Sequence, residues 1–160
     1  METIAKTELQ ALLPEESETM QNMFLLFLIE EQSYAIDIHY VIEIIEMMPL
    51  TVVPSLPGCM KGIINLRGAV IPIMDVRLRF GLMEAEYTER TCIVVVENAG
   101  SMLGLIVDAV QEVTTIEQEK RMPPPSSSVG GNSRYIKGVS RSSNAIQLIL
   151  DCDKLMDLMG

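Results

Sequence analysis

Short apolar runs separated by polar turns follow one another along the chain. Residues 24–29 are apolar, residues 30–33 are polar, and residues 34–38 are again mostly apolar. Two such runs joined by a short polar turn are typical of a β-hairpin. Residues 41–45 are rich in β-branched side chains, which favour a strand over a helix. The pattern therefore predicts a domain that opens with three strands.

The same pattern continues to the end of the chain. Arg67-Gly68 separates two apolar runs, and its glycine can supply the positive φ of a tight hairpin turn. The Pro-rich stretch 49–58 predicts a loop, with at most one helical turn at 59–61, and the Pro/Ser/Gly stretch 123–132 predicts another. The expected later elements are strands at 62–66, 69–74, 92–96, 103–107, 110–116, 135–139 and 145–150, a short helix within 75–81, and a final helix capped by Asp151 or Asp153.

The chain carries an internal repeat. Shifted by 76 positions, residues 60–63 align with 136–139, and Asp75 aligns with Asp151; shifted by 69, residues 41–44 align with 110–113. Each copy holds about five short strands, too few for an open sheet but enough to curl into a small barrel. The repeat predicts an all-β fold of two tandem five-stranded β-barrels with a short C-terminal helix.

Composition divides the chain into two parts. Residues 1–22 combine polar residues with one short amphipathic stretch and an acidic patch, which predicts a flexible N-terminal arm. Residues 23–160 carry the strand pattern and the repeat, so we expect one domain there, made of two intertwined barrel subdomains. A chain of this size buries roughly 70% of its unfolded surface, so folding needs no disulfide or metal.

Charge narrows the range of partners. The chain has 12 Lys and Arg against 22 Asp and Glu, a net charge of -10 at pH 7. Such a balance repels nucleic acid and anionic lipid, so we expect neither as a partner. No apolar run reaches the roughly 20 residues of a membrane helix, and no signal-peptide pattern opens the chain, which predicts a cytoplasmic protein without membrane insertion. The three cysteines are widely spaced and predict reduced core thiols.

Candidate catalytic chemistry is sparse. His39 is the only histidine, and no metal-binding, dinucleotide or phosphate-loop motif accompanies it. Acidic residues fall in expected loops and at strand ends, where solvated surface is more common than a catalytic carboxylate pair. We therefore expect no enzyme, cofactor or metal. A small-ligand or enzymatic β-barrel built around His39 remains as the alternative.

Residues 59–77 read CMKGIINLRGAVIPIMDVR, which closely resembles the central signature of the CheW family of bacterial chemotaxis coupling proteins. The resemblance extends from about Phe24 to Met159. It implies two five-stranded SH3-like barrels. It also implies an adaptor without catalytic activity that joins the cytoplasmic tips of chemoreceptors to the regulatory domain of the histidine kinase CheA, at membrane-bound receptor arrays. Assembly with other CheW-like domains, and coupling in another motility or signalling kinase array, fit the same resemblance.

The resemblance also implies partner-binding residues. Glu43 and Arg67 match the family's paired acid and base, while Val41, Gly62 and Val113 match its receptor-facing neighbourhood. Structural roles are open beside these. Gly62 can serve close strand packing, and Val41 and Val113 can be ordinary core residues.

Overall fold

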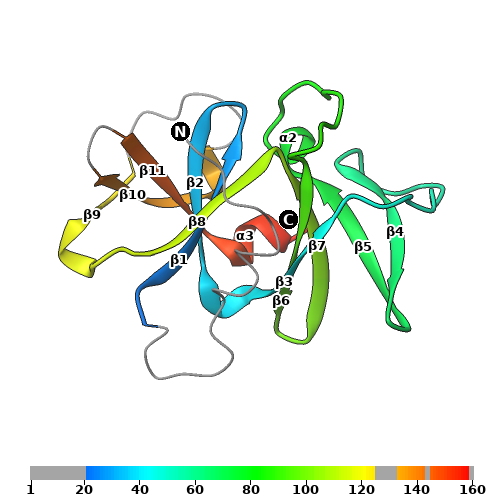
Figure 1. Cartoon of the computed structure of the whole chain (residues 1–160), viewed down its shortest axis with the longest axis horizontal. Helices are drawn as coiled ribbons and strands as arrows, with labels where there is room; N and C mark the ends of the chain where they lie inside the picture. Colours follow the sequence, from blue (N-terminus) through cyan, green and yellow to red (C-terminus); the bar gives the residue numbers. More distant parts are fainter. Residues whose placement is uncertain (1–20, 125–132, 143–144, 159–160) are drawn as a thin grey trace.

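The computed structural model describes residues 21–124, 133–142 and 145–158, and two antiparallel-rich sheets account for most of them (Figure 1). The six-stranded sheet has the order β8 (Ala109–Thr115), β1 (Met23–Ile29), β2 (Gln32–Asp37), β11 (Ala145–Leu150), β10 (Ile136–Ser142) and β9 (Arg121–Met122). The five-stranded sheet has the order β3 (Val41–Glu46), β6 (Cys92–Asn98), β7 (Ser101–Val107), β5 (Ala69–Asp75) and β4 (Met60–Leu66). Short helices connect and end them: α2 (Val76–Arg79), α3 (Cys152–Met156), and the 3-10 turns η2 (Ile38–Tyr40), η3 (Gln118–Lys120) and η4 (Ser133–Tyr135).

The two halves of the chain exchange strands. β3 leaves β1 and β2 to pair with β6, and β8 leaves β6 and β7 to pair with β1. Each sheet therefore contains strands from both copies of the repeat. The mostly-β prediction is confirmed, and the sheets are interleaved in sequence rather than built one after the other.

The repeat is visible in the geometry. The hairpins β4–β5 and β10–β11 both carry a bulge just before a glycine, Gly62 in one and Gly138 in the other. Asp75 and Asp151 end the two hairpins at equivalent positions and cap the helices that follow, accepting from the backbone N–H of Arg77 and Lys154. The repeat predicted from sequence thus corresponds to a repeated hairpin and helix cap. Residues 59–61, where at most one helical turn is expected, form no helix, because β4 already begins at Met60.

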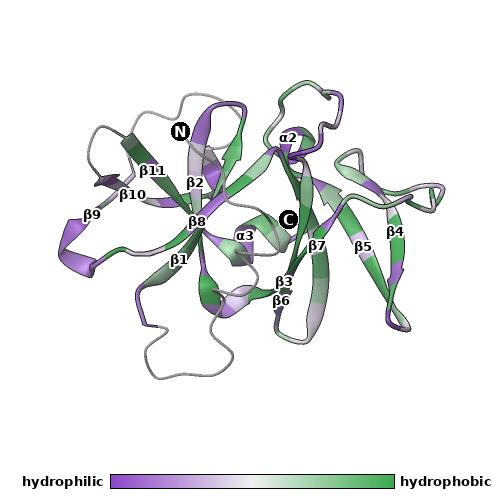
Figure 2. Ribbon diagram, in the orientation of Figure 1, coloured by the Kyte–Doolittle hydropathy of each residue, from purple (hydrophilic) through white to green (hydrophobic). Residues whose placement is uncertain are grey.

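The main apolar core lies between the two sheets, where helix α3 also packs (Figure 1). Four aromatic rings cross it in a row from the six-stranded sheet, with centroid separations of 6.0, 5.1 and 5.8 Å between Phe27, Tyr34, Phe80 and Tyr135. Smaller apolar clusters lie against each sheet, and the strands that line them are mostly hydrophobic (Figure 2). Burial of this kind is the dominant stabilising contribution to such a fold.

Cys59, Cys92 and Cys152 are all buried thiols, as their apolar flanks predicted. Burial, followed by the neighbouring carboxylates, raises the pKa of Cys152 to about 12, which keeps this thiol protonated and unreactive. Among the described residues, no helix is long and apolar enough to cross a membrane.

Candidate functional site

Arg67 stands at the tip of the β4–β5 hairpin. The turn has two residues, Arg67 with φ of 50° and Gly68 with φ of 89°. This is the positive-φ turn that matches the twist of a β-hairpin. The Asn65 side chain accepts a hydrogen bond from the Gly68 N–H at 3.0 Å and so fixes the turn. The arginine is presented at the end of the sheet by backbone geometry that the sequence encodes locally.

Glu43 reaches this turn from the other edge of the same sheet. β3 and β4 are the two edge strands of the five-stranded sheet, yet the Glu43 carboxylate forms an ion pair with the Arg67 guanidinium. The Arg67 side chain is 70% exposed, whereas that of Glu43 is 16% exposed. The acid is therefore the sheltered partner, and the arginine keeps free donors that face solvent.

A second contact joins the same two edges. After β3 the chain runs back to β4, where Thr51 and Ile63 exchange backbone hydrogen bonds, each 2.9 Å long. Gly62 lies beside this bridge, is buried, and has φ of +149°. A Cβ at this position would stand 2.4 Å from the Thr51 carbonyl oxygen. The geometry favours a packing role for Gly62.

Val41 and Val113 lie on different sheets. Val41 is on β3, two positions before Glu43, and pairs with Val96; Val113 is on β8 and pairs with Leu25. Both are half-buried against the main core between the sheets. The structure thus brings Glu43 and Arg67 together, and it leaves Val113 on the six-stranded sheet, apart from the strands that carry them.

The repeat provides an internal comparison for the ion pair. Glu112 occupies on β8 the place that Glu43 occupies on β3, and both strands have a bulge at the preceding residue. The counterpart of Arg67, however, is Ser143 in the sequence. Because the second copy keeps the hairpin without the arginine, the Glu43–Arg67 pair is not a requirement of the fold. It distinguishes one end of the molecule from the other.

The two ends also share a feature that sequence reasoning missed. Val70 on β5 and Ile146 on β11 are 76 positions apart and are both exposed, at 65% and 50%. Val52 is exposed beside Thr51, and Met122 is exposed on β9. Exposed apolar side chains therefore occur at both ends of the molecule, at β4–β5 and at β9–β11, and Figure 1 shows these strands at opposite ends.

A network of ion pairs between the sheets was also missed. Arg77 on α2 donates to Asp108, which lies between β7 and β8, and its guanidinium is 3.5 Å from Glu30 in the β1–β2 turn. The hydrogen bonds and charge of Asp108 raise the pKa of Arg77. Arg79 donates to the carbonyls of Leu155 and Asp157 at the end of α3. Such pairs join residues 31 or more positions apart, so no local pattern announces them.

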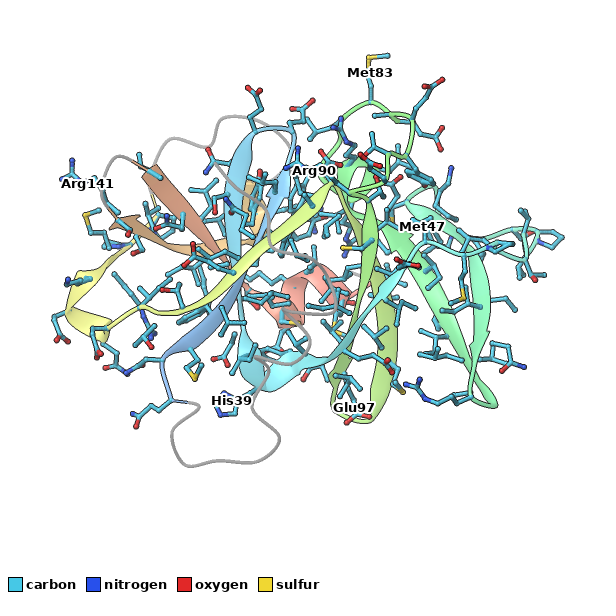
Figure 3. All side chains as sticks on the ribbon, in the orientation of Figure 1. His39, Met47, Met83, Arg90, Glu97 and Arg141 are labelled. Atoms are coloured by element: carbon cyan, nitrogen blue, oxygen red, sulfur yellow. The ribbon has the colours of Figure 1, made fainter. Side chains whose placement is uncertain are left out.

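His39 lies in an exposed turn, the 3-10 turn η2. The ring is exposed, and its Nδ1 lies 2.7 Å from the Asp37 carboxylate in the same turn. Figure 3 places His39 on the opposite side of the molecule from Arg90. In the part of the chain that the structure describes, no three His, Cys, Asp or Glu side chains gather as metal ligands would.

A family model of the CheW-like domain matches residues 23–159. The chain belongs to the CheW family. It is 31% identical to the chemotaxis protein CheW of Klebsiella aerogenes over 87% of this chain and 84% of that protein. It is 36% identical to CheW of Treponema pallidum, over 81% and 78% of the two chains.

A solved CheW has the same fold. The scaffolding protein TtCheW from Thermoanaerobacter tengcongensis aligns with a TM-score of 0.79 and 32% identity, covering 87% of this chain and 90% of that one. The alignment spans both sheets, so the resemblance carried by residues 59–77 extends to nearly the whole architecture. The CheW family membership predicted from that signature is confirmed.

Proposed function

We propose that this CheW-family chain is a chemotaxis adaptor that couples chemoreceptors to the histidine kinase CheA, without chemistry of its own. The observation that carries the proposal is the Glu43–Arg67 pair, in which a sheltered carboxylate orients an exposed guanidinium at the end of a sheet. An arginine held in this way presents planar donors in one geometry, which suits recognition of a partner's carboxylates or carbonyls. The pair is absent from the second copy of the repeat, as expected of a feature kept for binding.

The receptor is the partner we assign to this surface. Receptor tips are helical by the family resemblance, and a helix needs a polar anchor with apolar neighbours to dock. Ile42 on β3 is 43% exposed beside the half-buried Val41, and half-buried Leu66 precedes Arg67. These side chains supply apolar area beside the pair, with Val113 at the edge of the other sheet as a further candidate contact.

The two apolar ends are assigned to CheW-like domains. The regulatory domain of CheA has this fold by the family resemblance, so its ends resemble those of this chain. Val70 at one end and Ile146 at the other could each meet a matching strand face. Two similar surfaces at opposite ends allow one adaptor to bridge two partners, as a scaffold in a receptor array at the cytoplasmic side of the membrane requires.

Reconstitution tests the proposal directly. Kinase autophosphorylation is measured with receptor-containing membranes and CheA, with and without this protein. Receptor-dependent stimulation only in its presence supports the adaptor function, and equal kinase output in both mixtures contradicts it. A kinase from another motility array in the same assay separates the chemotaxis role from the alternative array.

A further inference from the structure

Gly62 has no side chain with which to contact a partner, and the residue is buried. It lies at the bulge of β4, where the register shifts between Met60 and Gly62 opposite β5. Its φ of +149° lies in a region that L side chains rarely adopt, and a Cβ would stand 2.4 Å from the Thr51 oxygen. Both observations require glycine here, for reasons of backbone geometry.

A side chain at position 62 would clash with the Thr51 carbonyl oxygen, which accepts one of the two hydrogen bonds of the Thr51–Ile63 bridge. The Thr51 oxygen accepts the Ile63 N–H at 2.9 Å, and the Thr51 N–H donates back to Ile63 over the same distance. A larger residue at 62 must push this carbonyl away. The displacement breaks the hydrogen bonds that attach the returning chain to β4.

The Thr51–Ile63 bridge and the Glu43–Arg67 ion pair both connect the part of the chain around β3 to the opposite edge of the five-stranded sheet, the β4–β5 hairpin. β3 ends at Glu46, and the chain reaches Thr51 through residues 47–50, where Met47, Met48 and Leu50 pack against the apolar cluster of the five-stranded sheet. Figure 3 labels Met47 on this segment, which crosses the five-stranded sheet on its way from β3 to β4. Once Thr51 is fixed on β4, the two edges of the sheet are held together. Glu43 on the edge strand β3 and Arg67 at the end of the other edge strand, β4, then face each other.

We propose that Gly62 is a positioning residue for the binding surface at Glu43 and Arg67. It admits the Thr51 carbonyl onto β4, and the resulting bridge holds β3 at the distance at which Glu43 orients Arg67. The inference rests on the function proposed above, and it assigns Gly62 an indirect role in receptor binding in place of a direct contact.

The second copy of the repeat supplies a matched control. Gly138 stands at the same bulge of β10, and β9 occupies the place of the Thr51 segment. There a Cβ would be 3.4 Å from the Met122 oxygen, and the backbone is outside the positive-φ region. Gly138→Ala therefore introduces the same methyl group at the equivalent position, where only a small adjustment of the neighbour is required.

The test combines amide exchange with a double-mutant cycle. Wild type, Gly62→Ala, Gly138→Ala, Glu43→Gln and the double variant Gly62→Ala/Glu43→Gln are titrated with a receptor cytoplasmic fragment, and exchange is followed at the Thr51 and Ile63 amides. We expect Gly62→Ala to accelerate exchange at both amides and to weaken binding about tenfold, while Gly138→Ala stays within about twofold of wild type. The double variant should bind no more weakly than the weaker single variant, because both changes disable one unit.

Several outcomes would overturn the inference. Multiplying losses in the double variant, or weakened binding with unchanged exchange at Thr51, would mean that Gly62 acts independently of the pair. If Gly62→Ala does not fold, Thr51→Pro replaces it, since it removes one bridge donor without touching β4; normal receptor binding by that variant contradicts the proposal. A wild-type protein that binds no receptor fragment refutes the proposed function itself, a result distinguishable from either of these.

Discussion

Arg77 binds both carboxylate oxygens of Asp108, with its Nε 2.9 Å from Oδ1 and its Nη2 2.6 Å from Oδ2. Arg77 lies on α2, after the five-stranded sheet, and Asp108 lies where the chain crosses from β7 to β8 in the other sheet. Asp108 also accepts the backbone N–H of Glu30 at 2.6 Å, and its own N–H donates to Leu28. The pair thus ties the crossover to both sheets.

Removing the guanidinium should destabilise the protein. Both side chains are mostly sheltered, with 19% and 27% exposure, so Arg77→Met leaves a charged Asp108 short of donors. We expect a loss of about 2 kcal/mol in the free energy of unfolding, measured by urea denaturation. Glu30→Gln is the control, because Glu30 is over half exposed and its pair with Arg77 is long, which predicts less than about 0.5 kcal/mol. Equal losses in the two variants would contradict this account of the pair.

Asp75 should make stability depend on pH in the direction opposite to most carboxylates. Its side chain is buried, and burial raises its pKa, although hydrogen bonds from Tyr87 and from the Arg77 backbone partly offset this effect. A raised pKa means that the folded protein binds the proton more tightly than the unfolded chain. The contribution of Asp75 is therefore full below its unfolded pKa of about 4 and is lost as the pH rises through the folded value.

Asp75→Asn isolates this contribution. Asparagine can still cap α2 and hydrogen-bond to Tyr87, but it does not ionise. The free energy of unfolding of the variant, relative to wild type, should increase as the pH rises from about 4 and then level off. Urea unfolding of both proteins over this range measures the difference, and a difference that falls with pH would show that the carboxylate is stabilised by the fold.

Two N-terminal truncations, one that keeps Asn22 and one that removes it, should differ in thermal stability. The Asn22 carbonyl accepts the Ile116 N–H at 2.8 Å, and its side chain accepts from Arg121 at 2.7 Å. Deleting residues 1–20 should change the melting temperature little, as expected for a terminal segment. Deleting residues 1–22 should lower it by a few degrees, equivalent to about 1 kcal/mol. Identical melting curves for the two truncations would show that the Asn22 contacts contribute nothing.

A charge at the apolar end should block assembly. Val70→Lys places a cation on the exposed face of β5, and the side chain at this position supports no core packing. We expect unchanged thermal stability within about 0.5 kcal/mol and clearly weaker binding to the regulatory domain of CheA. Binding is measured by titration calorimetry, with Val52→Lys as a second variant on the same end. Wild-type affinity in both variants would exclude this end as the kinase surface.

Local chemistry made much of the fold predictable. The Arg67-Gly68 turn, the Asp151 cap and the hairpin β10–β11 each follow from a few neighbouring residues, and the structure confirms them. The pairing of the strands could not be predicted from neighbouring residues. β3 and β8 carry matching patterns because they are repeat equivalents, so periodicity could not show that each pairs with a strand of the other copy.

The site was only partly predictable for a similar reason. Glu43 and Arg67 were paired by resemblance alone, since 24 positions and three prolines separate them. Thr51 lies between Pro49 and Pro54, a context that indicates a loop, and nothing local announces its bridge to Ile63. For Gly62 the resemblance implies the receptor-facing neighbourhood and close strand packing is the open alternative, and only the structure shows that the Thr51 carbonyl lies against it.

The central claim is that Arg67, oriented by Glu43, is where this adaptor meets its receptor. The most direct measurement is receptor-dependent stimulation of CheA as a function of adaptor concentration, for wild type, Arg67→Glu and the swap Glu43→Arg/Arg67→Glu, with thermal melts of each. We predict that Arg67→Glu abolishes stimulation, since a misplaced interface charge costs about 2–5 kcal/mol of binding. It should remain as stable as wild type within about 1 kcal/mol, because the substituted Arg67 side chain is 70% exposed and an ion pair with one exposed partner contributes little to folding. The swap should recover stimulation only in part, because the receptor's charges still face the wrong sign. Wild-type stimulation by a folded Arg67→Glu protein, or its loss only through unfolding, would contradict the account.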